Sequence, residues 1–202
     1  MLYRVLELPF TPFHYPVAYA LHRVYRKFGL PGLIVGSMFP DLEIPAIVLL
    51  FGTQIPHRLV LHSLLGAATI GTMLSVMFMI LLYPPLVSFF FKIDGEKIRS
   101  KCRLSLSLVS SCLLGNLSHV LLDVINHPYN PVFWPFLQIG ETPSPICSFL
   151  GGMESASLIL HISLIVVFYR GVRESTSESF WTIVSRGTDQ QILILIWLYG
   201  KF

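Results

Sequence analysis

The sequence predicts an all-α integral membrane protein, a polytopic transmembrane helical bundle of about four to five spans with a short N-terminal helix ahead of them. Hydrophobic residues make up 53% of the 202 residues and charged residues only 12%, which is too little charge to coat a water-facing surface. The mean hydropathy is +0.68, and several apolar runs approach the roughly 20 residues that cross a hydrocarbon core. We expect the whole chain to form one membrane-embedded domain.

The N-terminal part of the chain is expected to hold the short helix and the first span. Thr11-Pro12 is typical of a capped helix start, and this helix should run to about His22. A basic link then leads into an apolar segment from about Leu33 to Phe51, which we expect to be broken at Pro40 and Pro45. Unwound backbone at membrane depth normally lines a polar cavity.

Three further apolar runs predict the later spans, at residues 61–83, 104–125 and 152–169. The middle run is rich in Ser and Gly, which suits close packing against other helices. Residues 92–103 are expected to form a charged loop, and residues 126–150 a Pro- and aromatic-rich loop at the membrane interface. The final apolar run, residues 192–199, is too short to cross a membrane reliably alone.

The placement of lysine and arginine predicts the orientation of the spans. Basic residues concentrate in three links, at residues 23–27, 92–103 and 170–186, and the positive-inside rule places such links in the cytoplasm. The histidine-bearing ends of the predicted helices then face the other way. We therefore expect an integral plasma-membrane protein with its polar site toward the extracytoplasmic side. The net charge of +3 reflects this topology and not nucleic-acid binding.

Metal-ligand residue types occur in this chain where lipid should exclude them. His119 and Asp123 are four residues apart, so on a helix both side chains project from one face and can share a metal ion. The alternative is a hydrogen-bonded packing pair or a helix-end cap. Because an ionisable pair inside a membrane helix is energetically expensive unless it has a function, the ligand interpretation is favoured.

Four more residues complete the predicted ligand set: His14, Asp41, His57 and His62. Neutral imidazole is the commonest metal ligand, and Asp41 lies at the predicted break in the first span. In the alternative interpretation, His57 and His62 are interfacial histidines that contact water at a helix end, and Asp41 is a loop carboxylate. The three cysteines form no CxxC pair, which argues against a thiolate site. A His and Asp shell suits one to three divalent ions, for which zinc is favoured.

Other polar residues are expected to act around these ligands. Glu43 is the candidate general base, and Arg58 could pair with a phosphate group. Auxiliary polar groups are expected at three positions: His127, Glu154 and His161. Hydroxyl groups that orient the ligands are expected at Ser63 and Ser118.

Five motifs follow one another along roughly residues 10–137: Phe13-His14, Phe39-Pro-Asp-Leu-Glu43, Pro56-His-Arg-Leu-Val-Leu-His-Ser63, Gly115-Asn-Leu-Ser-His-Val-Leu-Leu-Asp123 and Phe133-Trp-Pro-Phe136. In this order and spacing the motifs resemble the predicted membrane-bound metal-dependent hydrolases of bacteria and archaea, with residues 151–202 as accessory helices. A more distant likeness is to the zinc-dependent phospholipase C fold. The late helical His-x-x-x-Glu pair of that fold is missing here, and Glu43 stands where a second Asp is expected.

The resemblance implies a metal-dependent hydrolase in which metal-activated water cleaves a phosphoester. The expected partners are membrane lipid and a lipid or lipid-linked phosphoester substrate, with no nucleic acid; the sequence does not fix the oligomeric state. The alternative is a non-enzymatic membrane protein in which the same residues form a metal-binding or ion-pathway polar core. An enzyme should have a closed cavity beside the metal, whereas a pathway should continue polar groups toward the basic links. A third interpretation makes the histidines interfacial anchors only.

Overall fold

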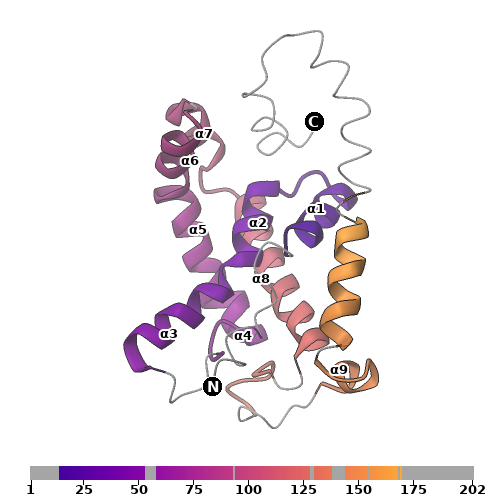
Figure 1. The fold of residues 1–202 in the computed structure, drawn as a ribbon. Coiled ribbons are helices and arrows are strands. Elements are labelled where there is room, and N and C mark those ends of the chain that lie inside the picture. Colours follow the sequence, from indigo (N-terminus) through magenta and orange to yellow (C-terminus); the bar gives the residue numbers. More distant parts are fainter. Residues whose placement is uncertain are drawn as a thin grey trace.

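The computed structural model describes residues 14–52, 58–92, 94–127, 130–137, 144–153, 155–167 and 169. Every regular element in these ranges is helical (Figure 1), which confirms the predicted all-α class. Three helical stretches are long and apolar enough to cross a membrane: Leu30–Phe51, Leu64–Leu81 and Leu106–Asn126. The fourth predicted span coincides with the apolar helix Ser155–Val167, which within the described residues is shorter than the three membrane-length stretches, and the run 192–199 lies outside the described residues.

Helix α1 (Tyr15–Val24) is the predicted short N-terminal helix. His14 lies immediately before its first turn, and Pro16 lies within that turn, where a missing backbone N–H breaks no helical hydrogen bond. Thr11 and Pro12, the predicted start, lie outside the described residues. The first turn of α1 therefore fixes the position of His14.

The first membrane-length stretch consists of three helical pieces. Helix α2 (Leu30–Met38) ends at the 3-10 turn η3 (Pro40–Leu42), and α3 (Glu43–Phe51) leaves that turn in a different direction (Figure 1). The predicted break at Pro40 is confirmed. The predicted break at Pro45 is wrong, because Pro45 lies in the first turn of α3, where no N–H is needed for the helix.

The second membrane-length stretch also changes its winding part-way. It begins as α4 (Leu64–Gly66), widens into the π-helical segment η4 (Ala67–Gly71) and continues as α5 (Thr72–Leu81). Such π segments are rare and frequently occur at functional sites. After Leu82 the chain turns into α6 (Tyr83–Phe91), whose first turn contains Pro84 and Pro85.

Two predicted loops contain short helices. Helix α7 (Gly95–Lys101) replaces most of the predicted loop at residues 92–103, because the Asp94 carboxylate caps it and Arg99 and Lys101 lie favourably in its last turn. Helix α9 (Pro145–Phe149) lies inside the predicted loop at residues 126–150. In that helix the Ser144 hydroxyl accepts a hydrogen bond from the Cys147 N–H, which stabilises the first turn.

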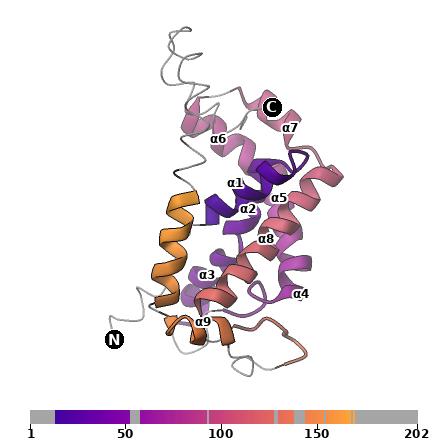
Figure 2. The same cartoon turned by 90° about the vertical axis from the view of Figure 1, so that its right-hand side faces the viewer.

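Helix α8 (Leu106–Asn126) is the centre of the bundle and runs beside α2 and α5 (Figure 2). Its contact with α2 is a backbone contact. A Cβ atom added to Gly36 would lie 2.4 Å from the Cys112 carbonyl oxygen, and one added to Gly115 would lie 2.5 Å from the Leu33 carbonyl oxygen. The small residues predicted to favour close packing therefore do so at this crossing.

The two ends of α8 have different surroundings. Near its start, the Ser107 hydroxyl donates to the Lys27 carbonyl (2.5 Å), and the Gly29 N–H donates to the Ser111 hydroxyl (2.8 Å). The basic link between α1 and α2 therefore lies at the same end of α8 as the basic helix α7, which precedes it. The predicted ligands on α8 lie in its other half, toward α9 (Figure 1). Which membrane face each end meets stays a prediction.

Candidate metal centre

Five side chains from four separate segments meet in one buried group, which we name the metal cluster. Its members are His14 before α1, Asp41 in η3, His62 before α4, and His119 and Asp123 on α8. Each of them is at most 8% exposed. The structure thus brings together five of the six predicted ligands, and the sixth, His57, lies outside the described residues.

The distances within the metal cluster are those of ligands around an ion. The Nε2 atom of His119 lies 3.5 Å from Asp41 Oδ1 and 3.6 Å from Asp123 Oδ2. The Nε2 atom of His62 lies 3.9 Å and 3.7 Å from the same two oxygens. These separations are too long for hydrogen bonds. They are close to the roughly 3.4 Å between donors on a tetrahedral ion with bonds of about 2.1 Å.

The inward-facing atoms of the metal cluster have no hydrogen-bond partner. They are buried and comprise the Nε2 atoms of His14, His62 and His119 and both carboxylate oxygens of Asp41 and Asp123. Arg58 Nε, which lies 3.3 Å from Asp123 Oδ2, offsets part of the charge of one carboxylate, but burying the other polar atoms without partners is strongly unfavourable. A divalent cation bound between them would satisfy the nitrogen lone pairs and the carboxylate charges together, so the donor set fits a metal ion.

Two histidines of the metal cluster are oriented by groups behind them. The Nδ1 atom of His62 lies 2.9 Å from Glu43 Oε2, and the Nδ1 atom of His119 lies 2.8 Å from the Ser37 carbonyl oxygen. A carboxylate or carbonyl at Nδ1 makes that nitrogen the donor and leaves the Nε2 lone pair for a metal. Both rings are therefore held with the metal-binding nitrogen toward the centre of the cluster.

Glu43 has an orienting role in this geometry. Its carboxylate accepts hydrogen bonds from the backbone N–H groups of Leu59 (3.1 Å), Val60 (2.8 Å) and Leu61 (3.1 Å), besides its contact with His62. These bonds fix the turn that carries His62. With both oxygens engaged by four donors, Glu43 is better suited to positioning His62 than to the predicted role of general base.

Replacing Glu43 by Gln should weaken metal binding by about 10- to 100-fold, the usual effect of losing an orienting partner. The amide cannot accept from all four donors and carries no charge to support the His62 ring. Isothermal titration of the purified protein with Zn²⁺ measures the effect. Glu96→Gln is the matched control, since Glu96 is 83% exposed. Unchanged affinity in Glu43→Gln would contradict the orienting role.

The chain matches a known protein family over most of its length. The family model described as YdjM inner membrane protein matches residues 14–199. The chain belongs to the YdjM inner membrane protein family. Together with its apolar helices, this membership makes it an integral plasma-membrane protein. No curated protein and no solved structure matched the chain.

The match begins at His14 and contains every residue of the metal cluster, so the cluster lies within the part that the YdjM family shares. A bacterial membrane family, which the motif order suggested, is confirmed. The hydrolase activity implied by the earlier resemblance stays a proposal.

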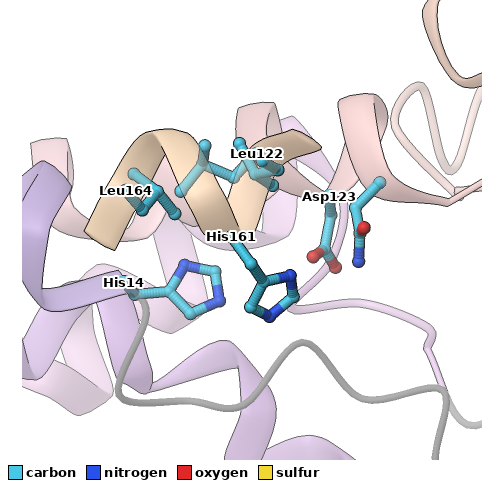
Figure 3. Close-up of a pocket in the computed structure, with 7 residues that line it drawn as sticks. His14, Leu122, Asp123, His161 and Leu164 are labelled. Carbon is cyan, nitrogen blue, oxygen red and sulfur yellow. The ribbon is translucent and has the colours of Figure 1, made fainter. Parts of the chain in front are cut away.

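A small pocket of this YdjM-family protein opens beside the metal cluster (Figure 3). Its polar lining comes from His14, Asp123 and Asn126, and from His161 on the helix Ser155–Val167. Its apolar lining comes from three leucines: Leu122, Leu160 and Leu164. His161 Nδ1 lies 2.6 Å from the Ser157 carbonyl oxygen, so its ring is held in a fixed orientation at the pocket. The predicted auxiliary residue His161 therefore lines the same pocket as His14 and Asp123 of the metal cluster.

Arg58 of this YdjM-family protein lies against Asp123. Its Nε atom is 3.3 Å from Asp123 Oδ2, and its Nη2 atom donates to His127 Nε2 at 2.8 Å. Burial, reinforced by the Arg58 cation, lowers the pKa of His127 to about 4, so that ring is neutral and accepts this bond. Because its Nε2 lone pair is engaged, the predicted auxiliary residue His127 supports Arg58 in this structure.

The protonation of two cluster histidines differs. Burial lowers the pKa of His14 to about 4, and the adjacent His119 adds to this effect, so His14 offers a free lone pair at neutral pH. Burial also acts to lower the pKa of His62, but contacts with the Asp41 and Glu43 carboxylates outweigh it and raise the value. A metal ion at His62 therefore competes with a proton.

The remaining predicted residues have local roles or lie outside the described residues. The Ser63 hydroxyl accepts from the Gly66 N–H (2.9 Å) and caps α4, which fixes the turn next to His62. The Ser118 hydroxyl donates to the Gly115 carbonyl in its own helix (2.7 Å). Glu154, like His57, is not among the described residues.

Sequence reasoning missed three groups near the metal cluster. They are the Ser37 carbonyl behind His119, Asn126, whose Nδ2 lies 3.3 Å from His127 Nε2, and Asn130, which donates to the Asp123 carbonyl at 2.9 Å. Asn126 directly precedes His127, so its place in the sequence could have indicated a role beside the cluster. Nothing in the sequence indicates such a role for the Ser37 carbonyl or for Asn130.

Proposed function

We propose that this protein is a membrane-bound metal-dependent hydrolase that cleaves a phosphoester in a lipid or lipid-linked substrate. One observation carries the proposal: buried imidazole and carboxylate atoms that lack hydrogen-bond partners converge beside a pocket. Nitrogen and oxygen donors without thiolate suit zinc or a similar divalent ion. Bound there, the ion would lower the pKa of a water molecule and polarise a phosphoryl oxygen.

In this proposal, some residues position the metal ligands and others bind the phosphate of the substrate. Glu43 and the Ser37 carbonyl hold the His62 and His119 rings in place. Arg58 lies beside Asp123 at the edge of the metal cluster, where a guanidinium can pair with the phosphate of the substrate. His127 accepts a hydrogen bond from Arg58 and keeps its guanidinium at that edge.

The surroundings of the pocket support a substrate that comes from the bilayer. The pocket lies between α8 and the helix Ser155–Val167, and the apolar part of its lining consists of three leucines. The outer faces of both helices expose large apolar residues, among them Leu121, Leu158 and Ile162. Apolar faces of this kind meet lipid in a membrane protein. A lipid could therefore reach the polar end of the pocket without passing through water.

One observation favours the alternative, a metal-binding or ion-pathway core without catalysis. Asn116 is fully buried one turn before His119, and its Nδ2 atom donates to the Ser75 hydroxyl at 3.0 Å. Beyond Asn116, however, the bundle is closed by an apolar cluster: Val76, Met79, Tyr83, Val87, Ile98, Cys102, Leu108 and Cys112. Polar groups that end at such a cluster suit a closed site better than a pathway to the basic links.

Purified protein in nanodiscs should hydrolyse at least one phosphoester lipid, and a chelator should abolish the activity. The panel would include phosphatidic acid, phosphatidylglycerol and the soluble diester bis(p-nitrophenyl) phosphate. Readdition of Zn²⁺ should restore hydrolysis, since His119 and Asp123 lie on the packed helix α8 and Glu43 holds the His62 ring. Phosphate or alcohol release, measured with and without chelator, gives the result.

A metal-loaded protein that hydrolyses nothing in this panel would favour the non-enzymatic alternative. A purified protein that takes up no divalent ion would favour the third interpretation, in which the histidines are interfacial anchors. Hydrolysis that persists in excess chelator would contradict the metal-dependent mechanism.

A further inference from the structure

The rings of His14 and His119 are stacked. Their centroids lie 4.1 Å apart, with an angle of 21° between the ring planes. The lone pair of an imidazole nitrogen lies in the plane of its ring. Because the two planes are nearly parallel and separated, an ion in the plane of one ring lies outside the plane of the other. The donor atoms of His14, Asp41 and His119 lie within 4.8 Å of one another, so two neighbouring ions, one in each ring plane, fit this arrangement better than one.

The Asp41 carboxylate spans the two stacked rings. Its Oδ1 atom lies 3.5 Å from His119 Nε2, and its Oδ2 atom lies 4.0 Å from His14 Nε2. One oxygen thus faces each ring. Neither oxygen has a hydrogen-bond partner although both are buried. A carboxylate in this position can bridge two ions, whereas an imidazole nitrogen, with one lone pair, can bind only one.

We propose that the metal cluster holds two ions bridged by Asp41, the first on His62, His119 and Asp123 and the second on His14. Ions held by stacked rings about 4 Å apart have the spacing of two-metal hydrolytic sites. This inference rests on the metal site of the proposed function and does not depend on which reaction the protein catalyses.

The two positions differ in how many protein donors they receive. At the first position, four donors converge: the Nε2 atoms of His62 and His119 and one oxygen from each of Asp41 and Asp123. Four protein donors complete a tetrahedral zinc shell, as in structural sites. At the second position the described residues supply His14 and Asp41 Oδ2, which is fewer protein donors than the four at the first position; catalytic zinc sites likewise have fewer protein ligands than structural ones.

Both positions border the pocket. His14, Asp123 and His161 are among its lining residues, and the His161 ring is drawn between the side chains of His14 and Asp123 (Figure 3). Asp123, which serves the first position, also lines the pocket, whereas Asp41, His62 and His119 do not. A substrate or water molecule in the pocket would therefore meet both positions, the first at Asp123 and the second, which has fewer protein donors, at His14.

Metal content tests the inference directly. Wild-type protein in nanodiscs, loaded with Zn²⁺ and desalted, should contain about two ions per chain, and His14→Ala should contain about one. Wild-type protein loaded with Mn²⁺ should show the electron paramagnetic resonance spectrum of a coupled ion pair, and His14→Ala that of an isolated ion. His22→Ala is the matched control on the same helix: the His22 Nδ1 bonds the Phe28 carbonyl (2.7 Å), away from the cluster, so both ions should stay.

One ion per chain in the wild type, or two ions in His14→Ala, would overturn the inference. The Mn²⁺ spectrum separates a lost ligand from a misfolded chain, because a misfolded His14→Ala protein would lose both ions, whereas the bridged site predicts that one remains. Two coupled ions in a protein that hydrolyses nothing would uphold the inference and contradict the proposed function. Hydrolysis by a protein that holds a single ion per chain would support the proposed function and contradict the two-ion inference.

Discussion

Replacing His119 by Ala is expected to remove metal binding and hydrolysis together, with an affinity loss of more than about 100-fold. His119 is fully buried, and its Nε2 atom lies within 3.6 Å of oxygens from both Asp41 and Asp123. Its loss removes a donor and leaves two buried carboxylates to repel each other. Metal analysis of the purified variant by mass spectrometry, together with the lipid hydrolysis assay, measures the effect.

Leu121→Ala is the matched control for this prediction, because Leu121 lies on the same turn of α8 but is 58% exposed on its outer face. It should keep the metal ions and the activity. The double variant His119→Ala with Asp123→Ala provides the stronger test. If its ion content equals that of the wild type, the metal cluster is not the metal site.

Replacing Gly115 by Ala should destabilise the bundle by about 1–3 kcal/mol and weaken metal binding at the same time. The added Cβ would lie 2.5 Å from the Leu33 carbonyl oxygen and 2.8 Å from the Ser37 backbone nitrogen, which are main-chain atoms that cannot rotate away. Helices α2 and α8 must therefore separate. Asp41 follows α2 and His119 lies on α8, so the separation also pulls the ligands apart.

Thermal unfolding in detergent and Zn²⁺ titration measure the two effects of Gly115→Ala. Gly29→Ala serves as the control, because its Cβ would meet only the Ser111 hydroxyl oxygen at 3.9 Å, an ordinary contact. If Gly115→Ala lowers stability but leaves metal affinity unchanged, the site does not depend on the close crossing of the two helices.

The sequence predicted the helical class and most ligands because both depend on local patterns. The spacing of His119 and Asp123 places them on one face of any helix, and Pro40 disrupts any membrane span. The charged loop at residues 92–103 was a less reliable prediction, because polarity does not distinguish a loop from a short capped helix such as α7. Pro45 was misjudged because its effect depends on where α3 begins.

The residues that orient the site could not be assigned from the sequence. Glu43 looked like a general base because it is a carboxylate near Asp41, but its four hydrogen-bond donors come from residues 59–62, beyond the end of α3. The stacking of His14 on His119 joins segments more than 100 positions apart. Contacts of this kind follow from the packing of α1, α2 and α8, which no local pattern specifies.

The ligands come from four segments that are distant in sequence, so each bound ion is also a cross-link. In lipid, the hydrophobic effect provides little attraction between helices, and the chain must hold them by close packing and polar contacts. An ion bound by ligands from these four segments restricts the loops between them, much as a disulfide does. The cross-link joins α1, η3, the turn before α4, and α8. The folded bundle should therefore gain stability with the concentration of free metal, and a metal-starved cell would hold a looser form of this protein.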